Sequence, residues 1–337
     1  MSAVAASDGE TPDATIEQEA SVSIGVVIPA YNSVDTLART INSCLPHVDP
    51  YDIVVVFDGP DEAAEKIARD ASDEIRILTL DERSGAPVCR NEGLALTDTD
   101  YVMFMDADDY VEGPLLELGS RTARTEDADV VLSPFCFERP DGSREVAYPH
   151  GRYGALDRDE IVGKWLSGDY TPPCAVIWRS DFVRKIGGWD EYLAKNQDGD
   201  LMYRALLHGA HVTASSEGLG VYVQSGDPRR ITSRNTRKTL ISQLAVLDRV
   251  RADMPKLRRA PCGELAHAYY SLARLAYDGD VDEIGRHAEM LARELGLEGQ
   301  PGTPAHVVVA SLLGLRGKQR LMKIMRRSVD TLAWHAV

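Results

Sequence analysis

The chain has 337 residues, of which 44% are hydrophobic, so it can bury a substantial core in one large domain or two smaller ones. Its 53 acidic residues outnumber the 37 basic ones, and the net charge of -16 argues against nonspecific nucleic-acid binding as the main activity. No apolar run approaches the roughly 18 to 20 residues that a membrane-spanning helix needs.

Residues 1–20 contain five acids, no base and no apolar run of the kind found in signal peptides. They are predicted to form a disordered acidic leader. The five cysteines are widely spaced and include no Cys-x-x-Cys pair: Cys44, Cys89, Cys136, Cys174 and Cys262. This pattern predicts reduced, mostly buried thiols in a cytoplasmic protein, and neither zinc ligands nor a disulfide framework.

From residue 22 onward, strands alternate with helices. Apolar runs predict strands at 22–28, 53–57, 75–80 and 101–105, and helical spacing predicts helices at 34–45, 61–71 and 87–96. Short connections between such elements imply parallel strands, hence an α/β fold with a doubly wound, mainly parallel sheet. No Gly-x-Gly-x-x-Gly, Gly-x-x-x-x-Gly-Lys-Ser/Thr or Gly-x-Ser-x-Gly pattern occurs, which weakens dehydrogenase, P-loop and hydrolase interpretations.

The middle of the chain continues this alternation. The predicted elements are a helix at 115–125, one strand at 129–137, a hairpin return at 145–148, a helix at 157–167 capped by Asp157, a strand at 175–178, a helix at 197–208 and a strand at 221–224. Beyond residue 236 only helical patterns occur, at 240–250, 264–277, 282–295 and 307–313. Residues 236–337 are therefore predicted to form a C-terminal helical appendage.

The predicted strand at 101–105 runs directly into Asp106-Ala107-Asp108-Asp109. Ligands of open α/β sheets bind at the carboxyl ends of strands, and two aspartates two positions apart can face one Mg²⁺ or Mn²⁺ ion. A calcium loop does not fit, because Tyr110 and Val111 occupy its fifth and glycine positions. Chance Asp-x-Asp pairs are frequent in so acidic a chain, so this motif alone does not decide the function.

Six motifs occur in order along the chain: Val26-Val27-Ile28-Pro29-Ala30-Tyr31-Asn32, Asp58-Gly59, Gly85 with Arg90-Asn91-x-Gly93, Asp106-Ala107-Asp108-Asp109, Gly187-Gly188-Trp189-Asp190-Glu191 and Gln197-Asp198. In order and spacing they resemble the family 2 glycosyltransferases of GT-A fold, over about residues 22–230. The resemblance implies a GT-A domain at 21–235 that transfers a sugar, with inversion, from a nucleotide-diphosphate donor. The donor is a UDP-sugar by default, and the acceptor hydroxyl belongs to a glycan, a lipid-linked molecule or a small molecule.

The resemblance also implies roles for individual residues. The implied donor-binding residues are Pro29, Tyr31, Asp58, Arg90, Asp106, Arg229 and Arg230. Asp108, together with Asp106, is implied to hold Mg²⁺ or Mn²⁺ on the diphosphate. Asp198 is implied to be the catalytic base, and the start of the helix at 197–208 is expected to keep it ionised. Trp189 and Asp190 are implied to line the acceptor side.

Three departures from the family pattern leave alternatives open. Phe57 stands where a second aspartate is frequent, Gln197 stands where a glutamate is usual, and the loop after the last predicted strand has no histidine. A nucleotide-sugar-binding protein without activity therefore remains an alternative, as does a sugar nucleotidyltransferase. Without the resemblance, Asp198 would be interpreted as a residue that caps and charges a helix.

Residues 316–327 contain six basic side chains and no acid, interleaved with apolar side chains. Such a helix could rest on the anionic inner face of a membrane, through residues 315–327, or it could pack on the acidic body of the protein. The sequence leaves these two interpretations level.

Overall fold

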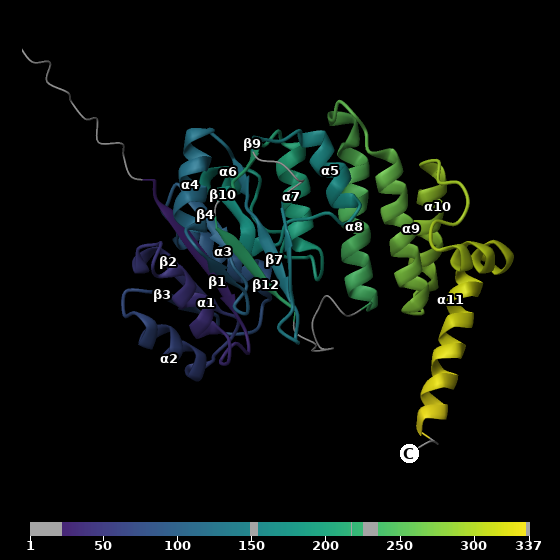
Figure 1. Ribbon diagram of the computed structural model, residues 1–337, viewed down its shortest axis with the longest axis horizontal. Coiled ribbons are helices and arrows are strands. Elements are labelled where there is room, and N and C mark those ends of the chain that lie inside the picture. The colour runs from purple at the N-terminus through teal and green to yellow at the C-terminus, as the bar shows by residue number, and fades with distance from the viewer. Residues whose placement is uncertain (1–21, 149–153, 217, 225–234, 335–337) are drawn as a thin grey trace, which may run out of the picture.

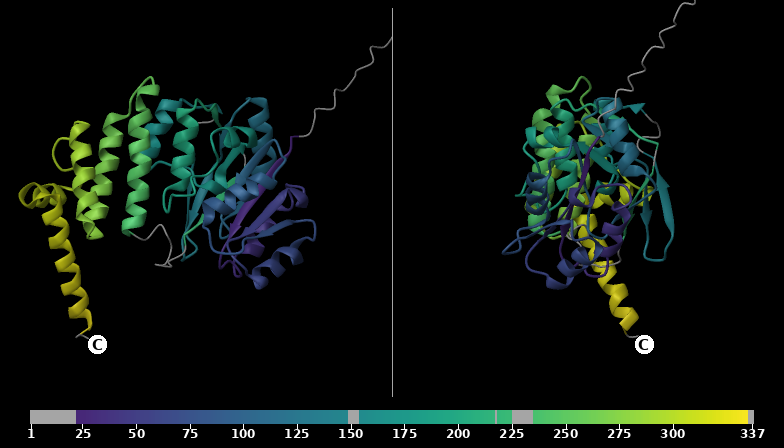
Figure 2. Two further views of the ribbon diagram at one scale, coloured as in Figure 1. Left: turned by 180° about the vertical axis from the view of Figure 1, so that it is seen from behind. Right: turned by 90° about the vertical axis from the view of Figure 1, so that its left-hand side faces the viewer.

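The computed structural model describes residues 22–148, 154–216, 218–224 and 235–334. The predicted leader at 1–20 lies outside the described residues, and so do Arg229 and Arg230. An α/β body occupies one end of the molecule, and a row of helices extends from it along the long axis (Figures 1 and 2).

The first hundred residues build the parallel half of the sheet. Strands β1 (Ile24–Ala30), β2 (Ile53–Phe57), β3 (Arg76–Thr79) and β4 (Tyr101–Phe104) lie parallel in the order β3-β2-β1-β4. Helices α1 (Leu37–Cys44), α2 (Glu62–Ala71) and α3 (Ala86–Leu96) connect them. Every residue of β2 is buried, as expected for a strand covered on both faces. These elements confirm the predicted alternation.

Beyond β4 the sheet becomes mixed. β10 (Val176–Arg179) lies antiparallel between β4 and β6 (Val130–Leu132), followed by β11 (Val212–Ala214) and β9 (Gly154–Ala155), which completes an eight-stranded sheet. A second, four-stranded sheet has the order β5 (Tyr110–Glu112), β12 (Leu219–Val223), β7 (Phe135–Glu138) and β8 (Arg144–Ala147). The antiparallel pairing of β7 with β8 confirms the predicted hairpin.

The prediction of one strand at 129–137 is wrong, because the chain changes sheets within it. β6 belongs to the large sheet and β7 to the small one. Ser133 donates its N–H to the carbonyl oxygen of Ala175 at 2.8 Å, and Pro134 has no N–H with which to continue the ladder. A similar change occurs at the acidic turn, since β4 and β5 lie in different sheets. The Asp106–Asp109 turn therefore sits where the two sheets meet.

Helices α4 (Leu115–Thr125), α5 (Arg158–Leu166), α6 (Ser180–Lys185) and α7 (Gln197–Leu207) cover the body, and short 3₁₀ turns lie at Pro50–Asp52, Pro173–Ala175 and Met254–Lys256. The Asp157 carboxylate accepts the N–H groups of Asp159 and Glu160 at 3.0 and 3.1 Å, which confirms the predicted cap of α5. The C-terminal helices are α8 (Arg237–Asp253), α9 (Cys262–Asp278), α10 (Asp282–Glu294) and α11 (Pro304–Trp334), the last interrupted at Gly314.

The C-terminal helices share a core with the body. One buried apolar cluster includes Val102 of β4, Leu201 of α7, Leu247 of α8 and Tyr269 of α9. α8 contacts α7, and the two helices stand close together in Figure 1. All five cysteines are free and four are buried, which confirms the prediction of mostly buried thiols. No helix in the described ranges is both long and apolar enough to cross a membrane.

Candidate functional site

A cleft of about 1240 Å³ opens at the carboxyl ends of β1 and β4. One side carries Pro29, Tyr31, Asp106 and Asp108, which follow or end these strands. Asp198, at the start of α7, lines the same cleft. The topology thus brings together residues that lie up to 169 positions apart (198 minus 29), as the carboxyl ends of an α/β sheet commonly do.

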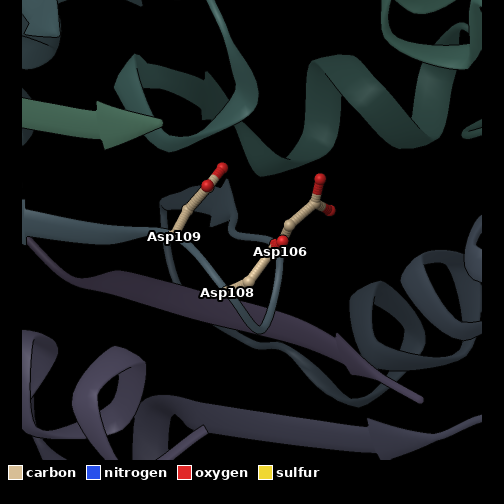
Figure 3. Close-up of side chains that lie close together, drawn as sticks. All are labelled: Asp106, Asp108 and Asp109. Carbon is tan, nitrogen blue, oxygen red and sulfur yellow. The ribbon is translucent and has the colours of Figure 1, made fainter. Parts of the chain in front are cut away.

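The acidic turn gathers three carboxylates (Figure 3). One carboxylate oxygen from each of Asp106, Asp108 and Asp109 lies within 4.8 Å of the other two. Asp106 and Asp108 line the cleft, whereas Asp109 is buried and accepts the N–H of Val223 at 2.9 Å. Oxygen ligands of this kind suit a hard cation such as Mg²⁺ or Mn²⁺, so the donor set fits the predicted metal. Sequence reasoning did not assign Asp109, because its proximity depends on pairing between β5 and β12.

Helix α1 holds the acidic turn in place. The Thr40 hydroxyl donates to the carbonyl oxygens of Ala107 at 3.0 Å and Asp109 at 2.7 Å, and Arg39 donates to the carbonyl oxygen of Asp108 at 3.0 Å. These bonds fix the backbone of the turn without using its carboxylates. The carboxylates of Asp106 and Asp108 can therefore face the cleft.

Arg90 connects the acidic turn to α7. Its guanidinium donates to Asp106 Oδ1 at 2.5 Å and to Gln197 Oε1 at 3.1 Å, and it lies 4.4 Å from the ring centre of Trp189. Only 5% of Arg90 is exposed. An added Cβ at Gly93 would lie 2.3 Å from Val27 Cγ1, so glycine lets α3 approach β1 closely enough for this reach. The buried cation thus links the predicted metal turn to the residue preceding Asp198.

Asp198 lines the cleft with a carboxyl group whose pKa is raised above its ordinary value by burial. Arg90 and the N–H groups of Asp198 and Gly199 lower this pKa, whereas Asp106 raises it. The helix start therefore acts in the predicted direction, but burial outweighs it. The expectation that the helix start keeps Asp198 ionised describes only one of these effects, and the net result is a more basic carboxylate.

The outer end of the cleft carries an aromatic ring and a cation. Tyr31 is 48% exposed, and the guanidinium carbon of Arg83 lies 3.9 Å from its ring centre. Pro29 and Arg83 also line the cleft. Asp58 is buried behind this pair, where it accepts the N–H groups of Ser84 and Gly85 at 2.6 and 2.9 Å. Asp58 thus shapes the turn that presents Arg83, a residue that sequence reasoning did not single out.

Trp189 and Asp190 do not line the cleft in the described part of the chain. Trp189 is buried, and its main-chain N–H and C=O bond to the Asn91 side chain at 2.8 and 2.9 Å. Asp190 pairs with Arg249 of α8 at 2.9 Å. The Asn91 of one motif thus holds the Trp189 of another, while Asp190 joins the body to the C-terminal helices.

The basic residues of α11 make intramolecular ion pairs. Arg316 and Arg320 pair with Asp282, the latter at 3.2 Å, and Lys323 pairs with Asp280 at 2.7 Å. Apolar side chains on the helical segment after Gly314 remain exposed, among them Leu321 at 38% and Ile324 at 64%. These pairs favour packing on acidic neighbours for the basic side chains, and they leave an apolar face outward.

Comparison with known proteins identifies the α/β body. Residues 25–184 match the family model described as "Glycosyl transferase family 2". This part of the chain belongs to glycosyl transferase family 2. The pre-mycofactocin glycosyltransferase of Mycobacterium tuberculosis is 30% identical over 196 residues, which are 56% of this chain and 40% of that protein. The succinoglycan biosynthesis protein ExoU of Rhizobium meliloti is 29% identical over 212 residues, 57% of this chain and 59% of that protein. The chain thus spans about half the length of these relatives.

Solved structures support the fold. The structure of S. aureus TarS residues 1–349 in complex with UDP-GlcNAc superposes with a TM-score of 0.57, covering 81% of this chain and 92% of that one at 15% identity. At this identity the likeness concerns the fold alone. It confirms the GT-A type α/β fold, and helices follow the sheet at the C-terminal end as predicted.

Proposed function

We propose that the protein is an inverting glycosyltransferase that moves a sugar from a nucleotide-diphosphate donor, a UDP-sugar by default, to an acceptor hydroxyl. The observation that carries this proposal is the cleft itself, in which a pair of aspartates suited to a metal faces a carboxylate suited to be a base. Membership of the body in glycosyl transferase family 2 and the likeness of its fold to a UDP-GlcNAc-bound structure support the same conclusion.

In the proposed donor site, the nucleobase of the donor is held by Tyr31, Pro29 and Arg83, because an exposed ring beside a guanidinium offers a stacking surface. Asp106 and Asp108 would hold Mg²⁺ or Mn²⁺, which neutralises charge on the diphosphate. Arg90 adds a buried positive charge whose hydrogen bond orients the Asp106 carboxylate. Arg229 and Arg230, outside the described residues, are proposed to reach the diphosphate.

In the proposed reaction, the acceptor oxygen attacks the anomeric carbon while the bond from that carbon to the diphosphate oxygen breaks. The bonding electron pair leaves with the nucleoside diphosphate, and the hydroxyl proton passes to the Asp198 carboxylate. A carboxylate made more basic by burial accepts this proton more readily, and general-base catalysis typically contributes about 10² to 10⁴ in rate. A single displacement from the opposite face inverts the anomeric centre.

The test is calorimetric titration of UDP, GDP and dTDP into the wild type, Asp108→Ala and Asp198→Asn, each with and without Mn²⁺. We expect metal-dependent binding of one nucleotide, loss of binding in Asp108→Ala, and retained binding without turnover in Asp198→Asn. Turnover retained in Asp198→Asn would refute the assignment of Asp198 as the catalytic base. Absence of turnover from both the wild type and Asp198→Asn would favour a nucleotide-sugar-binding protein. Absence of binding for all three nucleotides would refute the donor site.

A further inference from the structure

The lining of the cleft differs in character from one part to another. The donor half is walled by polar and charged side chains, among them Arg83, Asp106 and Asp108. Aromatic and aliphatic side chains form another part of the lining, which comes from α5, α7, α8, α9 and the segment before β10. This apolar wall includes Trp165, Tyr170, Tyr203, Leu247, Ala268 and Leu272.

The apolar wall begins at the proposed base. Burial raises the pKa of the Tyr170 and Tyr203 hydroxyls, and the nearby Asp198 carboxylate raises it further. The ring of Trp165 lies 6.2 Å from that of Tyr170 and 6.4 Å from that of Tyr203, centre to centre and steeply inclined. These three rings form a continuous aromatic surface next to Asp198.

The wall continues onto the C-terminal helices. An added Cβ at Gly163 of α5 would lie 3.6 Å from the Glu264 side chain of α9, so the two helices are in close contact. The N–H of Ala194, just before α7, donates to the Ser242 hydroxyl of α8 at 2.7 Å. Helices α8 and α9 thus form part of the proposed active-site cleft, in addition to covering the body.

The residues that α8 and α9 contribute carry no charge. In the described part of the chain they are Gln243, Leu247, Ala268, Ser271, Leu272 and Leu275. A sugar ring placed against leucine and alanine would lose hydrogen bonds to water without replacement, whereas an apolar group would gain from leaving water. The cleft, at about 1240 Å³, also exceeds the roughly 300 to 1000 Å³ of common ligand pockets, so it has room for a molecule beside the donor.

We propose that α8 and α9 complete an acceptor subsite for an apolar alcohol, a molecule whose reacting hydroxyl is carried by an aromatic ring or an aliphatic chain. The hydroxyl lies at Asp198, and the ring or chain packs against Tyr170, Ala268 and Leu275, which are half-buried and line the cleft. This inference rests on the proposed glycosyltransferase function and adds the chemical class of its acceptor.

The test compares Ala268→Asp with Ala245→Asp. Ala268 is half-buried and lines the cleft, whereas Ala245 is exposed on α8 and does not line it, so the same charge is added to the appendage at both sites. 2-Naphthol, 1-octanol and methyl β-glucoside are titrated by calorimetry into protein saturated with UDP and Mn²⁺. We expect an apolar alcohol to bind more tightly than the glucoside, with at least tenfold weaker binding in Ala268→Asp and less than twofold change in Ala245→Asp. Whichever of naphthol and octanol binds better distinguishes a ring-bearing from a chain-bearing acceptor.

Tighter binding of the glucoside, no binding of either apolar alcohol, or equal behaviour of the two variants would overturn the inference. If Ala268→Asp does not fold, Leu275→Asn replaces it, since Leu275 is only half-buried and lines the same wall. UDP binding in the same samples separates the two proposals. Absence of UDP binding to the wild type would refute the donor site. UDP binding without binding of either apolar alcohol would refute only the acceptor class.

Discussion

Replacing Arg249 with methionine should loosen the junction between α7 and α8. Arg249 of α8 donates to Asp200 Oδ1, and at 2.9 Å to Asp190 Oδ2. Asp200 lies two residues after Asp198 in the first turn of α7 and is 0% exposed. Its other oxygen accepts from Arg204 Nε at 2.8 Å. The change would therefore leave a buried carboxylate with one of its two guanidinium partners.

The expected cost follows from burial. Removing one partner of a buried ion pair costs about 3 to 5 kcal/mol. Because the Arg249 side chain is 33% exposed and Arg204 remains, we expect a smaller loss, about 2 to 3 kcal/mol in the free energy of unfolding. For a chain of 337 residues that corresponds to about 3 to 4 °C in melting temperature.

The assay is thermal and urea unfolding of Arg249→Met, Asp200→Asn and the double variant. In the double variant we expect a loss smaller than the sum by about 1 to 2 kcal/mol, because both partners of the pair are then neutral. Arg251→Met is the matched control, since Arg251 on the same helix pairs with Glu294 at 2.9 Å while both side chains are more than 40% exposed. That pair should contribute less than about 1 kcal/mol. Equal destabilisation by Arg249→Met and Arg251→Met would refute the reasoning.

Three further outcomes are expected. Arg249 holds the pKa of Asp190 below its ordinary value against the effect of burial. The stabilisation from this pair is therefore present above the unfolded pKa of about 3.9 and is lost as pH falls through the lower folded pKa. In an acid titration, the free energy of unfolding should fall less in Arg249→Met than in the wild type. Arg83→Ala should weaken UDP binding by about fivefold, because about 1 kcal/mol of stacking and charge at Tyr31 is lost. The exposed Arg121 is the control, and Arg121→Ala should leave the affinity for UDP unchanged. Unchanged affinity in Arg83→Ala would contradict the proposed nucleobase site. If α11 contacts membranes, Leu321→Ser with Ile324→Ser should reduce sedimentation with phosphatidylglycerol vesicles. An equal loss of sedimentation of the wild type in high salt would indicate binding by charge rather than by the apolar face.

The parts of the fold that depend on local pattern could be predicted from the sequence. The strand Ile53–Phe57 and the helix Leu115–Thr125 have the predicted bounds, because an apolar run or a helical period continues without interruption across each. The antiparallel insertion of β10 between β4 and β6 could not be predicted in this way. It depends on partners that lie far apart in sequence, and so does the division of 129–137 between two sheets.

The same distinction applies to the candidate site. Asp106 and Asp108 could be singled out because they lie in the turn that follows the predicted strand at 101–105, and Asp198 because its motif resembles that of the family. Arg83 and the lining residues of α8 and α9 belong to none of the six motifs, and only packing brings them to the cleft. Trp189 belongs to a motif, but packing buries its ring, and the guanidinium carbon of Arg90 lies 4.4 Å from the ring centre.

The departure at Gln197 can be weighed against the geometry around it. Gln197 accepts a hydrogen bond from Arg90, which also binds Asp106 and lowers the pKa of Asp198. A glutamate at this position would add a negative charge next to a base whose pKa burial already raises, and a like charge raises it further. The amide accepts the same hydrogen bond without that charge. Gln197 therefore keeps Arg90 in position and leaves its positive charge acting on Asp198, so this substitution is compatible with a working base and does not by itself favour an inactive protein.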